Sequence, residues 1–252
     1  MTAATPVLPD GVGRVREARS AVDGVPWHPV PGWDRFRWLV HGTTGAGPDA
    51  DFGLFGGAPA GGVLARWLRL QQGLGATRTA HSHQVHGAAV MRHGDGPPGL
   101  LVARGQDGHV TGTAGTLLTV SVADCVPIYL LDPAHRRVAL LHGGWRGTAA
   151  GIVAAGIGAL DSDPGDVIAH LGPAICGQCY EVGPEVHDAL RLPAPPAPRP
   201  VDLRAVQAHR LLEAGVPAGQ ITVSGHCTLC GDGFYSHRGG SRERQLGVLG
   251  VR

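Results

Sequence analysis

Lysine and asparagine are both absent from this chain of 252 residues, so its 21 basic residues other than histidine are all arginine. Without lysine, the protein cannot form a Schiff base on a lysine side chain or use the lysine of a Walker-type phosphate loop. We therefore expect that any group that binds phosphate or a carboxylate is an arginine, a histidine or a backbone amide.

Long apolar runs are also missing. No segment approaches the roughly 18 consecutive apolar residues typical of a membrane-spanning helix, so we expect no membrane partner. The N-terminal sequence lacks the charged and apolar regions of a secretory signal, which favours a cytoplasmic protein. The formal net charge is only +1 and no basic stripe is present, which argues against nucleic acid as a partner.

Cysteine is scarce, with five residues, and an odd number fits a reducing compartment better than a disulfide framework. Apart from Cys125, the cysteines form two C-x-x-C pairs, Cys176 with Cys179 and Cys227 with Cys230. Two such pairs can form a closed four-cysteine zinc site. The stretch between them is, however, much longer than the roughly 15–20 residues of a ribbon-type site. Free thiols are the preferred interpretation, and a second zinc or a disulfide are the alternatives.

Three separate segments each carry a side chain suited to a metal: His86 in HSHQVHG, Cys125 in VADCVPIYLLDP and His142 in VALLHGGWRGTAAG. Two imidazoles and one thiolate are a natural set for a catalytic zinc, which is tetrahedral and keeps one position open. Because the segments are far apart in sequence, only the fold could bring them together. Buried histidines and an inert core cysteine are the alternative that the spacing alone leaves open.

The pattern of apolar residues predicts both strands and helices. Between Thr116 and His142, the segments TLLTVSV, VPIYLL and RVALLH are short, apolar and rich in β-branched residues, which predicts consecutive strands of one buried sheet. Other predicted strands are Phe36–His41, Asp166–Leu171 and ITVSG, and the predicted helices are Val63–Leu74, Gly147–Leu160 and Asp202–Ala214.

This mixture lacks strict βαβ alternation, which predicts an α+β fold: a single domain with mixed β-sheets flanked by helices. Residues 1–34 are rich in glycine, proline and arginine with little periodicity. We expect them to form an irregular N-terminal lead-in, with or without one strand. Residues 35–252 then form the catalytic domain.

Six motifs occur in order along the chain: QVHG, ADCVPIYLLDP, HGGWRGTAAGIV, GPAICGQCYEVGPEV, DLRAVQAHRLLEAGV and CTLCGDGFYSHRGGSRERQ. Together they resemble the YfiH-type family, whose names include laccase-domain protein, peptidoglycan editing factor and purine nucleoside phosphorylase. The resemblance extends from about Ala80 to Gln245, and more loosely over Trp38 to Leu70.

The resemblance implies a catalytic zinc site on His86, Cys125 and His142. It also implies a purine nucleoside phosphorylase that takes adenosine, inosine and methylthioadenosine with phosphate and has adenosine deaminase activity. One alternative is a metal-dependent amide hydrolase that edits peptidoglycan precursors. The other is a non-catalytic protein that binds a metal or a polyphenol. The family pattern places the C-x-x-C pairs in substrate-facing loops without requiring a second metal.

Copper is the less favoured metal. Two histidines and a cysteine also form blue-copper sites, often with a long methionine contact, and Met91 is the only internal methionine. A laccase of the multicopper type would need several H-x-H pairs, whereas this chain has one, His81 with His83. These two histidines are expected to lie beside the site or on the surface rather than to bind the metal.

Further residues are candidates for substrate binding. Asp107 in QDGHVT matches an acidic position of the family motif and could orient a zinc-bound water or a ligand histidine. Arginine binds phosphate through two parallel hydrogen bonds, and the arginines expected near the site are Arg146, Arg238 and Arg244. The candidates for an aromatic face against a purine are Phe234 and Tyr235.

Overall fold

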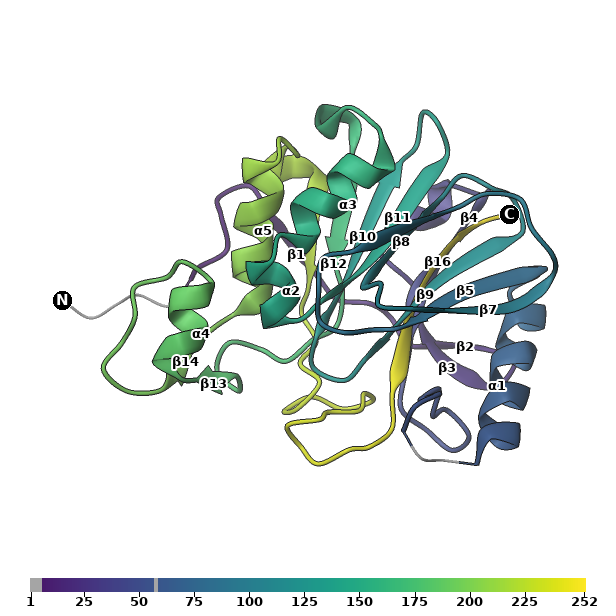
Figure 1. The fold of residues 1–252 in the computed structure, drawn as a ribbon, viewed down its shortest axis with the longest axis horizontal. Helices are drawn as coiled ribbons and strands as arrows, with labels where there is room; N and C mark the ends of the chain where they lie inside the picture. Colours follow the sequence, from purple (N-terminus) through teal and green to yellow (C-terminus); the bar gives the residue numbers. More distant parts are fainter. Residues whose placement is uncertain (1–5, 57–58) are drawn as a thin grey trace.

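Two seven-stranded mixed sheets pack face to face, and helices cover both outer surfaces (Figure 1). The computed structural model describes residues 6–56 and 59–252; residues 1–5, at the start of the predicted lead-in, and residues 57–58 lie outside the described part. Sheet 1 has the order β1 (Gly13–Val15), β15 (Ile221–Ser224), β12 (Ile168–Leu171), β10 (Val126–Asp132), β11 (Arg137–Gly143), β8 (Gly108–Thr111) and β6 (Val90–His93). Sheet 2 has the order β2 (Ser20–Val22), β3 (Val25–His28), β4 (Leu39–Thr44), β16 (Gln245–Val251), β9 (Thr116–Val122), β5 (Arg78–His83) and β7 (Gly99–Arg104).

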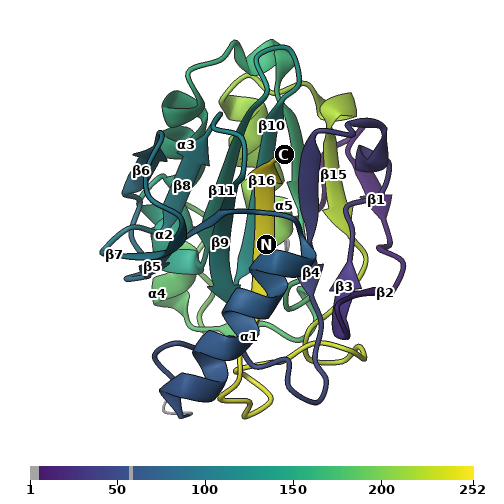
Figure 2. The same ribbon diagram turned by 90° about the vertical axis from the view of Figure 1, so that its right-hand side faces the viewer.

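Helices flank the two sheets on opposite sides. Helix α1 (Ala60–Gly73) lies against the outer face of sheet 2, in front of that sheet in Figure 2. The outer face of sheet 1 carries α2 (Trp145–Ala149), α3 (Ile152–Leu160), α4 (Pro184–Ala189) and α5 (Leu203–Glu213). A small two-stranded ribbon, β13 (Glu181–Val182) with β14 (Arg199–Pro200), adjoins α4. The α+β prediction of a single domain with mixed sheets flanked by helices is confirmed.

Strand β10 shows why the central segments are continuously apolar. Successive side chains of a strand point to opposite faces. Ile128 and Leu130 belong to the core beneath the helices, whereas Tyr129 and Leu131 belong to the core between the sheets. Both faces are therefore buried, and all four side chains are 0% exposed.

The prediction of one sheet for the segment Thr116–His142 is wrong. Strand β9 pairs with β16 and β5 in sheet 2, whereas β10 and β11 pair with each other in sheet 1. The chain crosses between the sheets in a turn at residues 123–125, so Cys125 lies at the crossing. Because strands buried on both faces have the same apolar composition in either sheet, the pattern could not assign them.

Two of the three predicted helices are confirmed. Helix α1 buries Val63, Trp67 and Leu70. Helix α5 begins after Asp202, whose carboxylate accepts the Arg204 backbone N–H at 3.0 Å, as expected of a helix-starting aspartate. The single helix predicted over Gly147–Leu160 is wrong: it is divided into α2 and α3 at Gly151, which has a φ of 90°. That left-handed conformation suits glycine and interrupts a helix.

The irregular lead-in predicted for residues 1–34 is corrected for residues 6–34. Strand β1 pairs in parallel with β15 of sheet 1, and β3 pairs with both β2 and β4 of sheet 2. These strands have only three or four residues, too few for a recognisable alternation. Residues 6–34 thus belong to the same domain as the rest of the chain.

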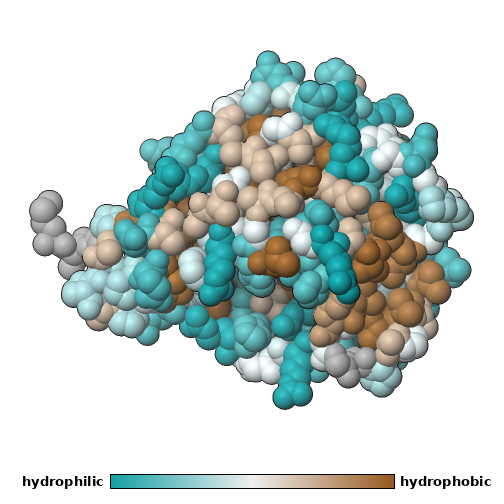
Figure 3. Space-filling view, viewed as in Figure 1, coloured by the Kyte–Doolittle hydropathy of each residue, from teal (hydrophilic) through white to brown (hydrophobic). Residues whose placement is uncertain are grey.

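The exposed side of α1 is partly apolar. Leu64 and Leu68 of this helix are 42% and 47% exposed, and Val102 of β7 is 42% exposed. In the space-filling view, apolar side chains gather on the side of the molecule where α1 and β7 lie (Figure 3). Among the residues that the structure describes, no helix combines the length and apolar character needed to cross a membrane.

Candidate metal and substrate site

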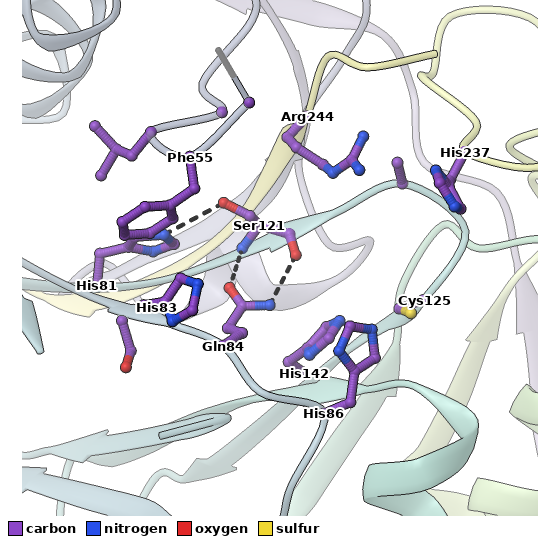
Figure 4. Close-up of a pocket in the computed structure, with 15 residues that line it drawn as sticks. Phe55, His81, His83, Gln84, His86, Ser121, Cys125, His142, His237 and Arg244 are labelled. Atoms are coloured by element: carbon purple, nitrogen blue, oxygen red, sulfur yellow. Dashed lines mark hydrogen bonds between the residues drawn. The ribbon is translucent and has the colours of Figure 1, made fainter. Parts of the chain in front are cut away.

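The structure brings His86, Cys125 and His142 together at one end of the two sheets (Figure 4). His142 belongs to β11 near its end, Cys125 lies in the crossing turn after β9, and His86 lies in the turn that follows β5. One potential ligand atom from each residue lies within 4.8 Å of the others. Three distant segments thus provide a compact set of two imidazoles and a thiol, as a site assembled by the fold requires.

The backbone around this set adopts uncommon conformations. His86 and Asp124, which precedes Cys125, have φ values of 60° and 89°, in the left-handed region that non-glycine residues avoid. Such strain persists only where surrounding contacts hold it, often at functional sites. At Gly144, a Cβ atom would lie 2.9 Å from Cδ2 of His86 and 3.2 Å from Sγ of Cys125. Glycine at position 144 is therefore needed for the close approach of the ligand side chains.

Asp107 holds two parts of the site in place. Its carboxylate is fully buried and lies 2.8 Å from Nδ1 of His142. It also accepts the backbone N–H groups of Val85, His86 and Gly87 at 3.0, 2.9 and 2.8 Å. The geometry matches a carboxylate that orients a ligand histidine through its second nitrogen, which leaves Nε2 of His142 on the side of Cys125.

The protonation of the set favours a thiolate. Burial raises the pKa of Cys125, but the charge of His142 and hydrogen bonds from His142 and His86 lower it to about 6. Burial lowers the pKa of His142, but the Cys125 thiolate and Asp107 raise it to about 9. The lowered pKa of Cys125 and the raised pKa of His142 favour a thiolate–imidazolium pair when no metal is bound. A metal that binds here must displace the proton of His142.

Replacing Asp107 with asparagine should weaken metal binding and reduce activity by about 10- to 100-fold each. An amide oxygen carries no negative charge, so it holds the His142 N–H and the backbone of the 85–87 turn less firmly. Metal titration and turnover of the same preparations measure the effect. Asp163→Asn is the control, because Asp163 caps an exposed turn away from the site; equal losses in the two variants would contradict the role of Asp107.

A cavity of about 300 Å³ opens over the three candidate ligands, within the size range of small-molecule sites. Loops and strand ends from both sheets surround it. Its lining residues include Phe55, His81, His83, Gln84, Ser121, His237 and Arg244 in addition to the ligand set. His81 is fully buried, contacts Thr119 Oγ1 at 3.1 Å and has a pKa lowered to about 4 by burial, so it is a neutral structural neighbour.

The candidate arginines occupy two different places. Arg244 lines the cavity, and its guanidinium lies over the site in Figure 4. Arg238 donates to the backbone oxygen of Glu181 and stacks 5.3 Å from the ring of Tyr180. Burial raises the pKa of Tyr180 to about 12, with the charge of Cys125 acting in the same direction and those of Arg238 and Arg146 against it. Arg146 stacks 4.3 Å from the ring of Trp145, and neither Arg146 nor Arg238 lines the cavity.

The two aromatic residues predicted to face a purine, Phe234 and Tyr235, lie outside the cavity. Phe234 is 8% exposed and packs 4.6 Å from the ring of His28, while the Tyr235 hydroxyl donates to Gly47 O at 3.1 Å. Neither lines the cavity; Phe55 does, with its ring 4.6 Å from that of His83. The available signal was a large apolar residue in a glycine-rich loop, GLFGG, which was not among the predicted site residues.

The chain is similar in sequence and in structure to known proteins of one family. Residues 51–252 match the family model described as "Multi-copper polyphenol oxidoreductase laccase". The chain is 37% identical over 240 residues to "Purine nucleoside phosphorylase YlmD" of Geobacillus stearothermophilus, covering 84% of this chain and 88% of that protein. The solved structure of that organism's YlmD has a TM-score of 0.81 at 33% identity, over 90% of this chain and 96% of that one. The chain belongs to the YfiH family.

Two other relatives of this YfiH-family chain carry informative names. "Adenosine deaminase RL5", from an unknown prokaryotic organism, is 37% identical over 159 residues, which is 57% of this chain and 58% of that protein. The structure of the YfiH protein of Bacillus licheniformis has a TM-score of 0.81 at 27% identity, over 90% of this chain and 96% of that one. The predicted family is confirmed, and it is a metal-binding family by its description.

The donor set of this chain bears on the choice of metal. Met91, the one methionine among the residues that the structure describes, lies on β6 and does not line the cavity. The one H-x-H pair consists of a buried His81 and a His83 that packs on Phe55. Two imidazoles and one thiolate can form a tetrahedral metal site with one open position.

Proposed function

We propose that this protein is a zinc-dependent purine nucleoside enzyme that catalyses phosphorolysis of adenosine, inosine and methylthioadenosine, and deamination of adenosine. The observation that carries the proposal is the convergence of His86, Cys125 and His142 beneath a cavity large enough for a small molecule. Relatives named purine nucleoside phosphorylase and adenosine deaminase support the same reactions. Purine nucleosides and phosphate are the proposed substrates.

His86, Cys125 and His142 would hold the zinc. The fit rests on the chemistry of the donors: the Cys125 pKa of about 6 makes the thiolate available, and Asp107 fixes the ring of His142 through Nδ1. When bound by such a set, zinc acts as a Lewis acid and lowers the pKa of water in its open position to about 7. The exposed ring of His86 stands at the cavity side of the set, where substrate arrives.

The other residues of the cavity would bind and position the nucleoside. The Phe55 side chain is 58% exposed and offers an apolar face to a purine ring. His83 packs against this ring and limits its movement. Gln84 is held by two hydrogen bonds to the backbone of Ser121, donating at 2.9 Å and accepting at 2.7 Å, so it fixes the wall next to His86.

The two reactions differ in their nucleophile: deamination uses water, whereas phosphorolysis uses phosphate. Phosphate is an anion and needs cationic groups, which in this lysine-free chain are arginines. Arg146, which stacks on Trp145, and Arg238, which stacks on Tyr180, are the proposed phosphate ligands, and Arg244 in the cavity wall is a third candidate. Because Arg244 lines the cavity and the other two arginines do not, single substitutions can distinguish the candidates.

Turnover of adenosine with and without phosphate tests the function. Adenine and ribose 1-phosphate should form only when phosphate is present, and inosine should form in its absence. The measurement is made on protein whose zinc content has been determined by metal analysis. If zinc-loaded protein produces neither adenine nor inosine, the proposed function is wrong.

Substituting the arginines singly with glutamine should separate the two reactions. The loss of a charge-assisted hydrogen bond of about 1.5–3 kcal/mol weakens apparent phosphate binding by about ten-fold or more. We expect Arg146→Gln or Arg238→Gln to impair phosphorolysis while deamination continues. Arg244→Gln tests the cavity wall in the same way, and Arg210→Gln is the control, because Arg210 is a partly buried arginine that pairs with Glu213 and does not line the cavity. Equal losses of both activities in all three site variants would contradict an arginine phosphate site.

A further inference from the structure

The four cysteines outside the cavity form a second cluster. Cys176 and Cys179 lie in the loop between β12 and β13, and Cys227 and Cys230 lie in the loop after β15. About 50 residues separate the pairs in sequence, yet the four sulfur atoms all lie within 4.8 Å of one another. Strands β12 and β15 are parallel neighbours, so their C-terminal loops leave sheet 1 on the same edge. The parallel pairing of β12 with β15 therefore brings the two C-x-x-C pairs together.

We propose that this cluster binds a second, structural zinc ion through four thiolates: Cys176, Cys179, Cys227 and Cys230. The sulfurs of Cys176 and Cys230 are 3.9 Å apart. Zinc–sulfur bonds of about 2.3 Å at tetrahedral angles separate neighbouring sulfurs by about 3.8 Å. The cluster thus has the dimensions of a four-sulfur zinc site, with all four positions filled by the protein.

Each C-x-x-C pair has the local geometry of a metal-binding turn. The N–H of Cys179 donates to Cys176 O at 3.0 Å, and the N–H of Gly231 donates to Cys227 O at 3.1 Å. Within each turn the two sulfurs lie within 4.8 Å of each other. A Cβ at position 231 would lie 2.5 Å from Cys227 O, so the second turn requires glycine there.

Backbone amides surround the sulfur of Cys227. The N–H groups of Cys176 and Cys230 point to Sγ of Cys227 at 3.2 and 3.5 Å. Hydrogen bonds of this kind stabilise a thiolate and offset the negative charge that four thiolates place around one Zn²⁺. One of the donors comes from the other pair, so the arrangement already links the two loops.

The cluster also supports the turn that carries Cys125. Thr228, between Cys227 and Cys230, donates its hydroxyl to Asp124 Oδ1 at 2.6 Å. Ile175, next to Cys176, donates its N–H to Asp124 O at 3.1 Å. Both cysteine loops therefore hold Asp124 in its left-handed conformation beside Cys125. A zinc that joins the loops would stabilise the position of Cys125 without contacting substrate.

Native mass spectrometry with metal analysis of the full chain, purified with zinc supplied, tests the proposal. We expect two zinc ions per wild-type chain and one in Cys230→Ser, where the exposed position limits damage to folding. Cys125→Ala is the matched control: it should lose the zinc at the cavity and keep the four-cysteine zinc. The double variant Cys125→Ala/Cys230→Ser should contain none. A wild-type protein with a single zinc that Cys125→Ala removes would overturn the proposal.

Thiol labelling of the wild-type protein gives a second test that does not depend on the folding of a variant. With zinc bound, the four cysteines should resist iodoacetamide until a chelator is added, after which all four should react. Immediate labelling of the exposed Cys230 in zinc-supplied protein would overturn the proposal. So would iron in place of zinc, or an intact mass lower by two hydrogens for each disulfide formed among these cysteines.

Discussion

Replacing Cys125 with serine should abolish most of the metal binding and lower turnover of adenosine by on the order of 10³-fold. A serine hydroxyl is not deprotonated near neutral pH, so it cannot replace the thiolate whose pKa is about 6 in this site. Loss of a metal that contributes several kcal/mol of transition-state stabilisation corresponds to a rate effect of this size. Metal analysis and steady-state kinetics of the same preparation measure both consequences.

His86→Gln should behave in the same way. Because His86 is exposed, the substitution should disturb folding little, and circular dichroism checks this. His135→Gln is the control, because His135 is an exposed histidine in the β10–β11 turn, at the opposite end of β11 from His142. Full turnover in either Cys125→Ser or His86→Gln would show that the residue is not a ligand of the catalytic metal.

Replacing Glu17 with glutamine should lower the free energy of unfolding at neutral pH by about 3 kcal/mol. Glu17 is 3% exposed and lies between β1 and β2, where one carboxylate oxygen contacts His170 Nε2 at 2.9 Å and the other accepts from Ser224 at 2.8 Å. The carboxylate thus ties the N-terminal segment to β12 and β15. A neutral amide leaves part of this buried network unsatisfied.

The pH dependence of stability should change in the same variant. Burial raises the pKa of Glu17, but the hydrogen bond and charge of His170 and the bond from Ser224 hold it below its ordinary value of 4.5. Because the pKa of Glu17 is lower in the folded than in the unfolded protein, its ionised form stabilises the fold above about pH 4.5. This contribution to the free energy of unfolding is lost as the pH falls through the folded pKa. Glu17→Gln should therefore show a shallower loss of stability in acid.

Urea unfolding at a series of pH values measures both effects. Glu213→Gln is the matched control, because Glu213 pairs with Arg210 on the surface and its side chain is 60% exposed. Surface pairs contribute about 0–1 kcal/mol, so the control should stay close to wild type. If Glu17→Gln is as stable as Glu213→Gln, the N-terminal strands are not coupled to sheet 1 through this carboxylate.

Local signals were sufficient for several elements. The periodic apolar residues of α1 and the capping Asp202 of α5 act within a few residues, and both helices form where the pattern places them. Gly151 interrupts the predicted third helix, because its φ of 90° depends on how α2 and α3 pack rather than on helix propensity. The short strands β1–β3 were not predicted. Strand β1 forms by pairing with the distant β15, whereas β2 and β3 pair with each other across the Asp23-Gly24 turn, which is a local hairpin signal.

For the candidate site too, some features were predicted from the sequence and others were decided by the fold. The resemblance to the YfiH-type family selected the candidate donors at positions 86, 125 and 142, together with the acidic residue at 107. That Asp107 bonds both to His142 and to the 85–87 turn is a property of the fold. The cavity wall was predicted less well: Phe55 and Arg244 line it, whereas Phe234 and Tyr235 support loops.

The sequence by itself determined the donor chemistry, the absence of lysine, the two C-x-x-C turns and the segments that become buried strands. The tertiary structure alone decided which sheet each strand joins, and therefore that the chain crosses between the sheets at Cys125. It also decided that the parallel pairing of β12 with β15 gathers four cysteines. The physical reason is that apolar periodicity reports burial, whereas strand partners are selected by contacts between residues far apart in the chain.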